Sequence, residues 1–139
     1  MSCTAADDCT AVGYDNNGQP IYVTESAGSW GSPTEISGSP GSGGFLNAVS
    51  CTAADDCTAV GSDNNSQPIY VTENAGSWGA RTEISGTPGG SGFLYAMSCT
   101  STGHCTAVGT DNNGQPIYVE STSEYAVTFD AQGGVPTPA

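Results

Sequence analysis

The chain has 139 residues, a length that fits one domain, and its 14 acidic residues oppose a single base, Arg81, so the formal net charge is −13. Such a charge repels phosphate backbones and anionic lipid headgroups, which excludes nucleic-acid and membrane-surface roles. No apolar run approaches the roughly 18 residues of a transmembrane helix, so membrane insertion is excluded as well. We expect short strands and tight turns, because glycine, serine, threonine and asparagine are abundant while leucine and lysine are nearly absent.

The chain consists of three copies of one repeat. The phrase SCTAADDCTAVG begins at Ser2 and returns at Ser50, and a variant, SCTSTGHCTAVG, begins at Ser98, which defines a period of 48 residues. We expect one repeat domain over 1–139, with repeats at 2–49, 50–97 and 98–123 and a C-terminal strand and tail at 124–139. A period in the forties is typical of β-propeller blades and also of the lobes of a β-trefoil.

Four strands are predicted within each period. They are defined best at Gln19–Glu25, Ser29–Ser37, Gly44–Cys51 and Cys57–Asp63. Apolar and polar residues alternate along these segments, as in a strand whose two faces differ. DNNG at 15–18 supplies residues that tolerate positive φ, and SGSPGSGG at 37–44 is a link between repeats.

Six cysteines form three evenly spaced pairs: Cys3 and Cys9, Cys51 and Cys57, and Cys99 and Cys105. We interpret them as disulfides formed outside the cytosol, each stapling the loop between the first two strands of a repeat. Closing so short a loop stabilises the fold by about 2 kcal/mol per bridge. Zinc is the alternative, but its knuckles usually have C-x2-4-C spacing, whereas this spacing is C-x5-C and the chain has one histidine. A redox role is disfavoured because reactive thiols need basic neighbours.

Two features of the repeat resemble known propeller blades. TESAGSW at 24–30 and TENAGSW at 72–78 resemble the Asp-box of sialidase-like blades, S-x-D-x-G-x-x-W, although Ser26 or Asn74 replaces the aspartate and the tryptophan comes one residue early. The whole unit is similar to the SCPSASxCVAVG repeats of secreted actinobacterial proteins. This resemblance implies an all-β fold of three tandem, four-stranded, β-propeller-like blades and no particular activity. A β-trefoil is the alternative, although no Q-x-W of the ricin type is present.

The sequence predicts no catalytic site, no cofactor and no enzyme activity. Sialidases hold the substrate carboxylate with three arginines, and this chain has one. His104 would have to serve a Ser–His–Asp triad, but it lies in a disulfide-closed loop and has no copy in the other repeats. We predict no metal site. The candidates for calcium are the paired loop acids Asp7, Asp8, Asp55 and Asp56, which the third repeat lacks.

Carbohydrate binding is the alternative function. Lectins with these folds stack sugars on exposed aromatic rings beside amide and carboxylate groups. The candidate rings are Tyr14, Trp30, Trp78 and Tyr95. The tryptophans also have a structural interpretation, as side chains that close a blade, and Tyr14 is not repeated.

The two ends of the chain do not match its middle. Only Met1 and Ser2 precede Cys3, so the first repeat lacks an inner strand, and we expect that a leader peptide was removed. YAVT in the tail resembles the inner-strand sequences YAMS and NAVS. We therefore predict an assembly strand that supplies the missing inner strand, within the chain or to a second copy. It consists of Tyr125, Ala126, Val127, Thr128 and Phe129.

We interpret the protein as a secreted, extracellular and non-enzymatic structural repeat protein. It is expected to form a homo-oligomer through unpaired blade edges, with the C-terminal segment as donor strand. Two three-bladed copies would close a ring, and a non-closing contact would make a fibre. The alternative partner is a glycan bound by a lectin-like module.

Overall fold

The computed structural model describes residues 1–36, 43–84, 91–101, 103–121 and 129–132, the last segment by its backbone path. These residues form antiparallel strands and turns. The described part of the chain contains no helix with the length and apolarity that a membrane span requires. The all-β prediction is confirmed, and there is one sheet for each copy of the repeated phrase. The inner strands of the second and third sheets begin in the last residues of the preceding repeat, at Gly44 and Gly92.

Each sheet is built from consecutive strands. The first contains β1 (Ser2–Ala5), β2 (Asp8–Tyr14), β3 (Pro20–Ser26), β4 (Ser29–Trp30) and β5 (Thr34–Glu35), of which β4 and β5 both pair with β3. The second contains β6 (Gly44–Ala53), β7 (Asp56–Asp63), β8 (Pro68–Asn74), β9 (Ser77–Trp78) and β10 (Thr82–Glu83), with β9 and β10 both on β8. The third contains β11 (Gly92–Ser101), β12 (His104–Asp111), β13 (Pro116–Ser121) and β14 (Phe129–Gln132).

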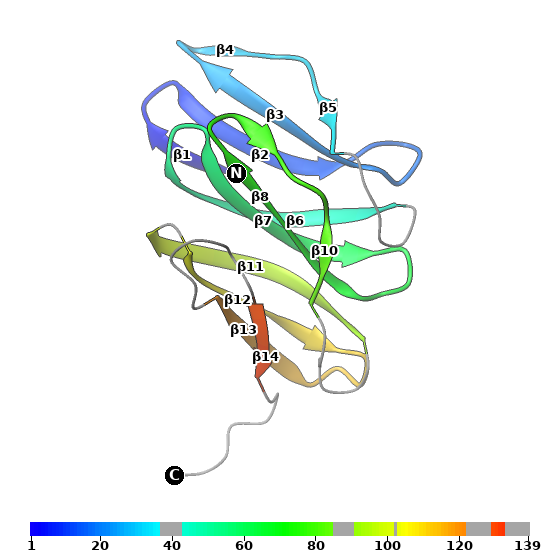
Figure 1. Cartoon of the computed structure of the whole chain (residues 1–139). Helices are drawn as coiled ribbons and strands as arrows, with labels where there is room; N and C mark the ends of the chain where they lie inside the picture. Colours follow the sequence, from blue (N-terminus) through cyan, green and yellow to red (C-terminus); the bar gives the residue numbers. More distant parts are fainter. Residues whose placement is uncertain (37–42, 85–90, 102, 122–128, 133–139) are drawn as a thin grey trace.

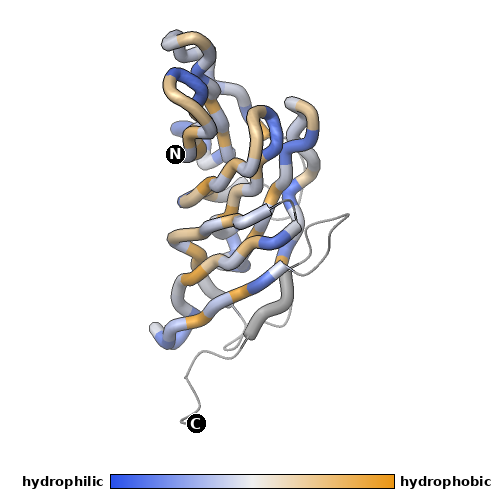
Figure 2. Tube along the Cα trace, turned by 90° about the vertical axis from the view of Figure 1, so that its left-hand side faces the viewer, coloured by the Kyte–Doolittle hydropathy of each residue, from blue (hydrophilic) through white to orange (hydrophobic). Residues whose placement is uncertain are grey.

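The three sheets lie one above another, with the first at the top of Figure 1 and the third at the bottom. The described strands form separate sheets and close no barrel. Hydrophobic and hydrophilic residues alternate along the strands (Figure 2), as predicted for sheets with two distinct faces. We call the face that a sheet turns toward the following repeat its lower face, and the opposite face its upper face.

Two apolar layers fill the spaces between the sheets. The layer between the first and second sheets contains Ile36, Leu46, Val49, Cys57, Ala59, Ile69 and Val71. The layer between the second and third contains Val60, Ile84, Leu94, Cys105, Ala107, Ile117 and Val119. The second sheet contributes to both layers, so it is buried on both faces, whereas each end sheet turns one face away from the stack.

The predicted outer strand, Ser29–Ser37, is divided into β4 and β5 by Gly31–Pro33. A proline cannot donate to a ladder, but the same break separates β9 from β10 at Gly79–Arg81, where there is no proline. In both repeats the glycine donates its N–H to a threonine carbonyl of the preceding strand, at 2.9 Å. The break is therefore a feature of the repeat and not an effect of Pro33.

The inner strands differ in length. β6 and β11 have 10 residues each, whereas β1 has 4 and pairs only with Asp8–Thr10 of β2. Among the described residues, no strand pairs with Ala11–Tyr14 on the side of β1. The first sheet therefore has an unpaired edge where the other two have an inner strand.

Candidate functional site

The repeated phrase forms a disulfide-closed hairpin in each sheet. The three predicted bridges are confirmed as Cys3–Cys9, Cys51–Cys57 and Cys99–Cys105, each with 4.0 Å between the Cα atoms. In each bridge the two cysteines face each other across the pair of strands that the loop connects. Disulfides of this kind indicate an oxidising, non-cytoplasmic environment.

The hairpin is also the joint between consecutive sheets. Cys51 donates its backbone N–H to Oγ of Ser2 at 3.0 Å, and Cys99 does the same to Ser50 at 3.0 Å. Oγ1 of Thr10 lies 3.8 Å from Sγ of Cys57. The lower face of one sheet therefore holds the disulfide hairpin of the next through the serine that opens the phrase.

The DNNG turns join the sheets at a second point. The side chain of Asp15 accepts the N–H groups of Asn17 and Gln19, and the same pattern recurs in the other two repeats. The carbonyl of Gly18 at the end of this turn accepts the N–H of Gly44, the first residue of β6, at 2.7 Å. In the same way, Gly92, the first residue of β11, donates its N–H to the carbonyl of Ser66 in the turn of the second sheet, also at 2.7 Å. The turn thus fixes where the next inner strand begins.

Aromatic side chains complete the first joint. Tyr22 on the lower face of the first sheet lies 5.3 Å, between ring centroids, from Trp78 of the second sheet. Trp78 is the register partner of Glu73, so both side chains lie on the upper face. Val12, the register partner of Tyr22, packs against the same apolar layer. This pair of rings thus connects the central strand region of the first sheet to the outer strand of the second.

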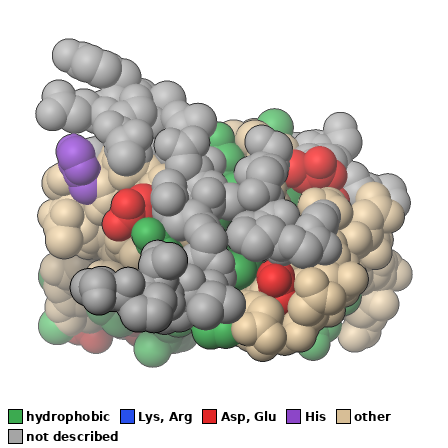
Figure 3. Space-filling model, turned by 90° about the horizontal axis from the view of Figure 1, so that it is seen from below, with side chains coloured by type: hydrophobic (Ala, Val, Ile, Leu, Met, Phe, Trp, Pro, Cys, Tyr) green, Lys and Arg blue, Asp and Glu red, His purple; other side chains and the backbone are tan. Residues whose placement is uncertain are grey.

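The lower face of the third sheet exposes to solvent a valine and a tyrosine that match Val12 and Tyr22 of the first sheet. Val108 and Tyr118 are register partners and are 48% and 41% exposed, whereas Val60, one repeat earlier, is 0% exposed. With Tyr95 they line an apolar hollow of 440 Å³. Figure 3 views the molecule from this side and shows hydrophobic and acidic side chains among the coloured atoms, with no lysine or arginine visible. A face that is buried inside the stack is therefore repeated at its end.

The upper face of the first sheet is the counterpart of this exposed face. Ala11, Ile21 and Val23 are only partly buried there, whereas the corresponding residues of the second sheet are 0% exposed. Trp30 occupies the position of Trp78 and is 46% exposed. The end faces thus carry the two halves of a joint, Tyr118 on one and Trp30 on the other.

Glu73 places a buried carboxylate in the first joint. Its side chain is 2% exposed, and its Oε2 atom has no hydrogen-bond partner among the described residues. Burial, followed by the charges of Asp55 and Asp56, raises the pKa of Glu73 above its ordinary value of 4.5. The side chain of Trp78 acts in the opposite direction but does not outweigh burial. The charged form of this buried carboxylate therefore destabilises the folded state at neutral pH.

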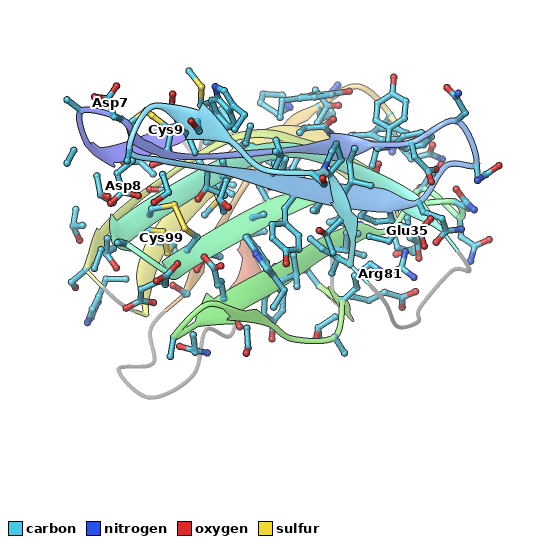
Figure 4. All side chains as sticks on the ribbon, turned by 90° about the horizontal axis from the view of Figure 1, so that it is seen from above. Asp7, Asp8, Cys9, Glu35, Arg81 and Cys99 are labelled. Atoms are coloured by element: carbon cyan, nitrogen blue, oxygen red, sulfur yellow. A yellow bond between two sulfur atoms is a disulfide. The ribbon has the colours of Figure 1, made fainter. Side chains whose placement is uncertain are left out.

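A second buried polar group lies at the opposite end of the sheets. In Figure 4, Arg81 and Glu35 are at the end away from Asp7, Asp8 and Cys9. Arg81 is 4% exposed; burial lowers its pKa, and the charge of Asp63 acts in the opposite direction. A side-chain hydrogen bond with Asp63 is the main cause that raises the pKa of Glu83. This cluster joins the DNNS turn at 63–66 to the outer strand β10.

The four predicted sugar-stacking rings do not come together. Tyr14 is exposed at the rim and makes an edge contact with Phe45, with ring centroids 4.6 Å apart. Trp78 is inside the first joint, while Trp30 and Tyr95 lie on the two opposite end faces. No two of them form one binding platform.

The predicted catalytic and metal candidates remain dispersed. In the part of the chain that the structure describes, no three acidic, histidine or cysteine side chains form a group that could hold a metal ion. Asp7 and Asp55 adopt positive φ in the tips of the stapled loops, and Asp8 and Asp56 open the strands that follow. His104 is exposed at the start of β12.

Most of the predicted assembly strand, Tyr125–Thr128, lies outside the described residues. Phe129 is the first residue of β14, which pairs with β13 of the same chain as the fourth strand of the third sheet. The described part of this segment therefore lies at the outer edge of its own sheet, not at the inner edge of the first.

Sequence reasoning missed Ser2 and Ser50 as joint residues, and it missed Val108 and Tyr118 as residues of an exposed end face. The signal was available, because they repeat with the period and alternate along their strands. The sequence did not show in which order the sheets stack, and this order decides which of the equivalent residues are covered by another sheet.

These features define a class: an open stack of three disulfide-stapled sheets, connected by two similar joints, in which each end sheet turns one face away from the stack. Comparison of the sequence with protein-family models and with curated proteins found no match.

Proposed function

We propose that the protein is a secreted, non-enzymatic structural protein of propeller-like blades that self-associates head to tail. The lower face of the third sheet of one copy packs on the upper face of the first sheet of the next. This contact repeats, between molecules, the joint that holds consecutive sheets together within the chain.

The observation that carries the proposal is the exposure of a face whose two equivalents within the same chain are each packed against the following sheet. Val108 and Tyr118 are 48% and 41% exposed, and Val60 is fully buried under the third sheet. Large exposed apolar surfaces on soluble proteins mark interaction sites. A second copy is the fitting occupant, because the central strands of its first sheet carry Ala11, Ile21 and Val23, the residues that the second and third sheets use at the same positions to cover such a face.

The aromatic pair makes the complementarity specific. Within the chain, Tyr22 packs on Trp78; between copies, Tyr118 would pack on Trp30 in the same way. Ser98 likewise occupies the position of Ser2 and Ser50, which accept the N–H of a cysteine from the next sheet. The matching donor on a second copy is Cys3.

Face stacking replaces strand donation as the proposed mode, because β14 pairs with β13 in its own chain. A lower face that meets an upper face is a heterologous contact. Such contacts produce a ring if the rotation closes and a filament if it does not. The unpaired edge of β2 adds a second surface at the same junction.

The test is sedimentation velocity on the full chain, with oxidised disulfides, and on single variants of each half of the pair. We expect Trp30→Ala and Tyr118→Ala each to shift the protein toward monomer, and the double variant to lose little more than either single one, because both remove one contact. Tyr14→Ala is the control, since it removes an exposed ring outside both end faces.

A wild-type protein that stays monomeric at millimolar concentration would overturn the proposal. Retention of the oligomer in both face variants would do the same. Tryptophan fluorescence offers a second readout. Trp78 already packs on Tyr22 within the chain, so a blue shift of the emission on association comes from Trp30 as its indole leaves water. Electron micrographs of the same sample separate rings from filaments.

A further inference from the structure

A cavity of 270 Å³ lies between the second and third sheets. Its upper wall is a row of hydroxyl groups: Ser50 on β6 is the register partner of Thr58 on β7, which is the partner of Thr72 on β8. The Cys99–Cys105 bridge and Ser101 line it from the third sheet. The cavity extends from buried Thr58 toward exposed residues at the loop end of the stack.

The cavity has a structural cause. The first joint contains the same hydroxyl row, but there the following sheet turns the long side chain of Glu73 toward it. The third sheet has Ser121 at this position, and its short side chain is held to its own sheet. Oγ of Ser121 accepts the N–H of Cys105 at 2.8 Å and donates to the carbonyl of Gly103 at 2.8 Å. The second joint is therefore less completely filled than the first.

We propose that this cavity binds a neutral, polyhydroxylated ring of the size of one sugar. Threonine and serine hydroxyls both donate and accept hydrogen bonds, as ring hydroxyls do. Asp56 and Asn74 add carboxylate acceptors and an amide at the cavity wall. Pockets for drug-sized ligands span about 300–1,000 Å³, so 270 Å³ suits a single ring and not an oligosaccharide.

Other ligand classes fit the lining less well. An anion would face Asp56 with no lysine or arginine among the described lining residues. An apolar ring would cover the hydroxyls of Thr58 and Thr72 without satisfying them, which costs free energy. A small organic cation would gain from the carboxylate but would leave most of the hydroxyl row unused.

The first experiment is an NMR titration of the uniformly labelled full chain with D-glucose, D-galactose and myo-inositol. Cyclohexanol serves as a ring with one hydroxyl, and ethanolamine as a small cation. We expect saturable shifts from at least one of the three polyols, at the amides of Thr58, Thr72 and Ser101. Tighter binding of cyclohexanol or ethanolamine would overturn the proposal, as would the absence of saturable shifts from all three polyols.

A matched pair of variants tests the position. Thr72→Val removes one hydroxyl from the cavity with little change in shape, and it should weaken polyol binding roughly fivefold, the effect of one hydrogen bond. Thr24→Val makes the same change in the first joint and should leave binding unaltered. Equal effects of the two variants would contradict the assignment. If Thr72→Val does not fold, Ser101→Ala at the lower wall provides the same test.

Discussion

Gly13, Gly61 and Gly109 hold the same position in the three repeats, yet their surroundings differ. A Cβ atom at Gly61 would overlap the carbonyl oxygen of Phe45 and lie 2.9 Å from Cα of Leu46. Gly109 meets the third sheet's inner strand in the same way. At Gly13, where no described inner strand passes, nothing lies within 4 Å. The missing side chain thus lets the inner strand pass close to the backbone in the second and third sheets, whereas the first sheet has no such close contact among the described residues.

We expect Gly61→Ala to destabilise the protein by about 2 kcal/mol or more, because the new methyl group meets backbone that cannot turn aside. Gly13→Ala should change the free energy of unfolding by no more than about 0.5 kcal/mol, as at an open surface. Urea denaturation of both variants measures the difference. Similar losses would mean that an inner strand covers Gly13 as well.

Glu73 makes stability depend on pH in a predictable direction. Its pKa is raised in the folded state, so the folded protein binds the proton more tightly than the unfolded chain does. The contribution to stability is therefore complete below the unfolded pKa, near 4.5, and is lost as the pH rises through the folded value. Glu73→Gln should make the protein less dependent on pH above about 4.5 and more stable than wild type at pH 7.

The control for this variant is Glu25→Gln, which removes one negative charge at the same position of the first repeat, where the side chain is only half-buried. Unfolding midpoints of the three proteins from acid to neutral pH provide the measurement. If Glu25→Gln flattens the pH profile as much as Glu73→Gln, the effect comes from total charge and not from burial.

At the scale of elements, the sequence predicted the strands and the staple but not the joint. Alternation located the strands of each sheet, and the cysteine spacing predicted the hairpin bridge, because both depend on residues close in the chain. The bond from Cys51 to Ser2 depends on how two sheets stack, which no local pattern specifies. The break between β4 and β5 was missed for a similar reason, since it follows from pairing with β3.

Removing a bridge should therefore have two separable effects. Cys3→Ser/Cys9→Ser and Cys51→Ser/Cys57→Ser open loops with the same sequence separation of 6, so the gain in unfolded-state freedom is the same, about 2 kcal/mol. The second bridge also packs against Thr10 in the first joint, and its removal should cost more. Thermal or urea unfolding compares the two variants. Equal losses would show that the bridge acts only through the unfolded chain.

At the scale of the whole molecule, the period predicted three equivalent units but not their unequal exposure. Val12, Val60 and Val108 are the same residue in the same strand context. Only the position in the stack decides that Val60 is buried and that Val108 is 48% exposed. The candidate interface is therefore a property of the assembled sheets, and sequence reasoning placed it instead at strand edges and in a tail.

The end faces also carry charges that oppose their association. Glu120 lies on the lower face of the third sheet, where the other repeats have Thr24 and Thr72, and a stacked copy would bring Glu25 to the same joint. With a net charge of −13 on each copy, repulsion also acts at long range. Raising the ionic strength shortens the screening length from about 30 Å at 0.01 M to about 8 Å at 0.15 M.

Salt should consequently strengthen self-association, the opposite of its effect on an interface built from ion pairs. We expect the weight-average mass in sedimentation equilibrium to rise between about 0.01 M and 0.15 M sodium chloride, over the range in which screening changes most. Glu120→Thr, which restores the residue of the other two repeats, should raise the mass most at low salt and weaken its dependence on salt. Asp55→Asn removes one charge from the exposed hairpin tip of the second sheet, which belongs to neither end face, and serves as the control for net charge. A mass that falls with added salt, or a Glu120→Thr variant no different from Asp55→Asn, would exclude this pair of faces as the contact.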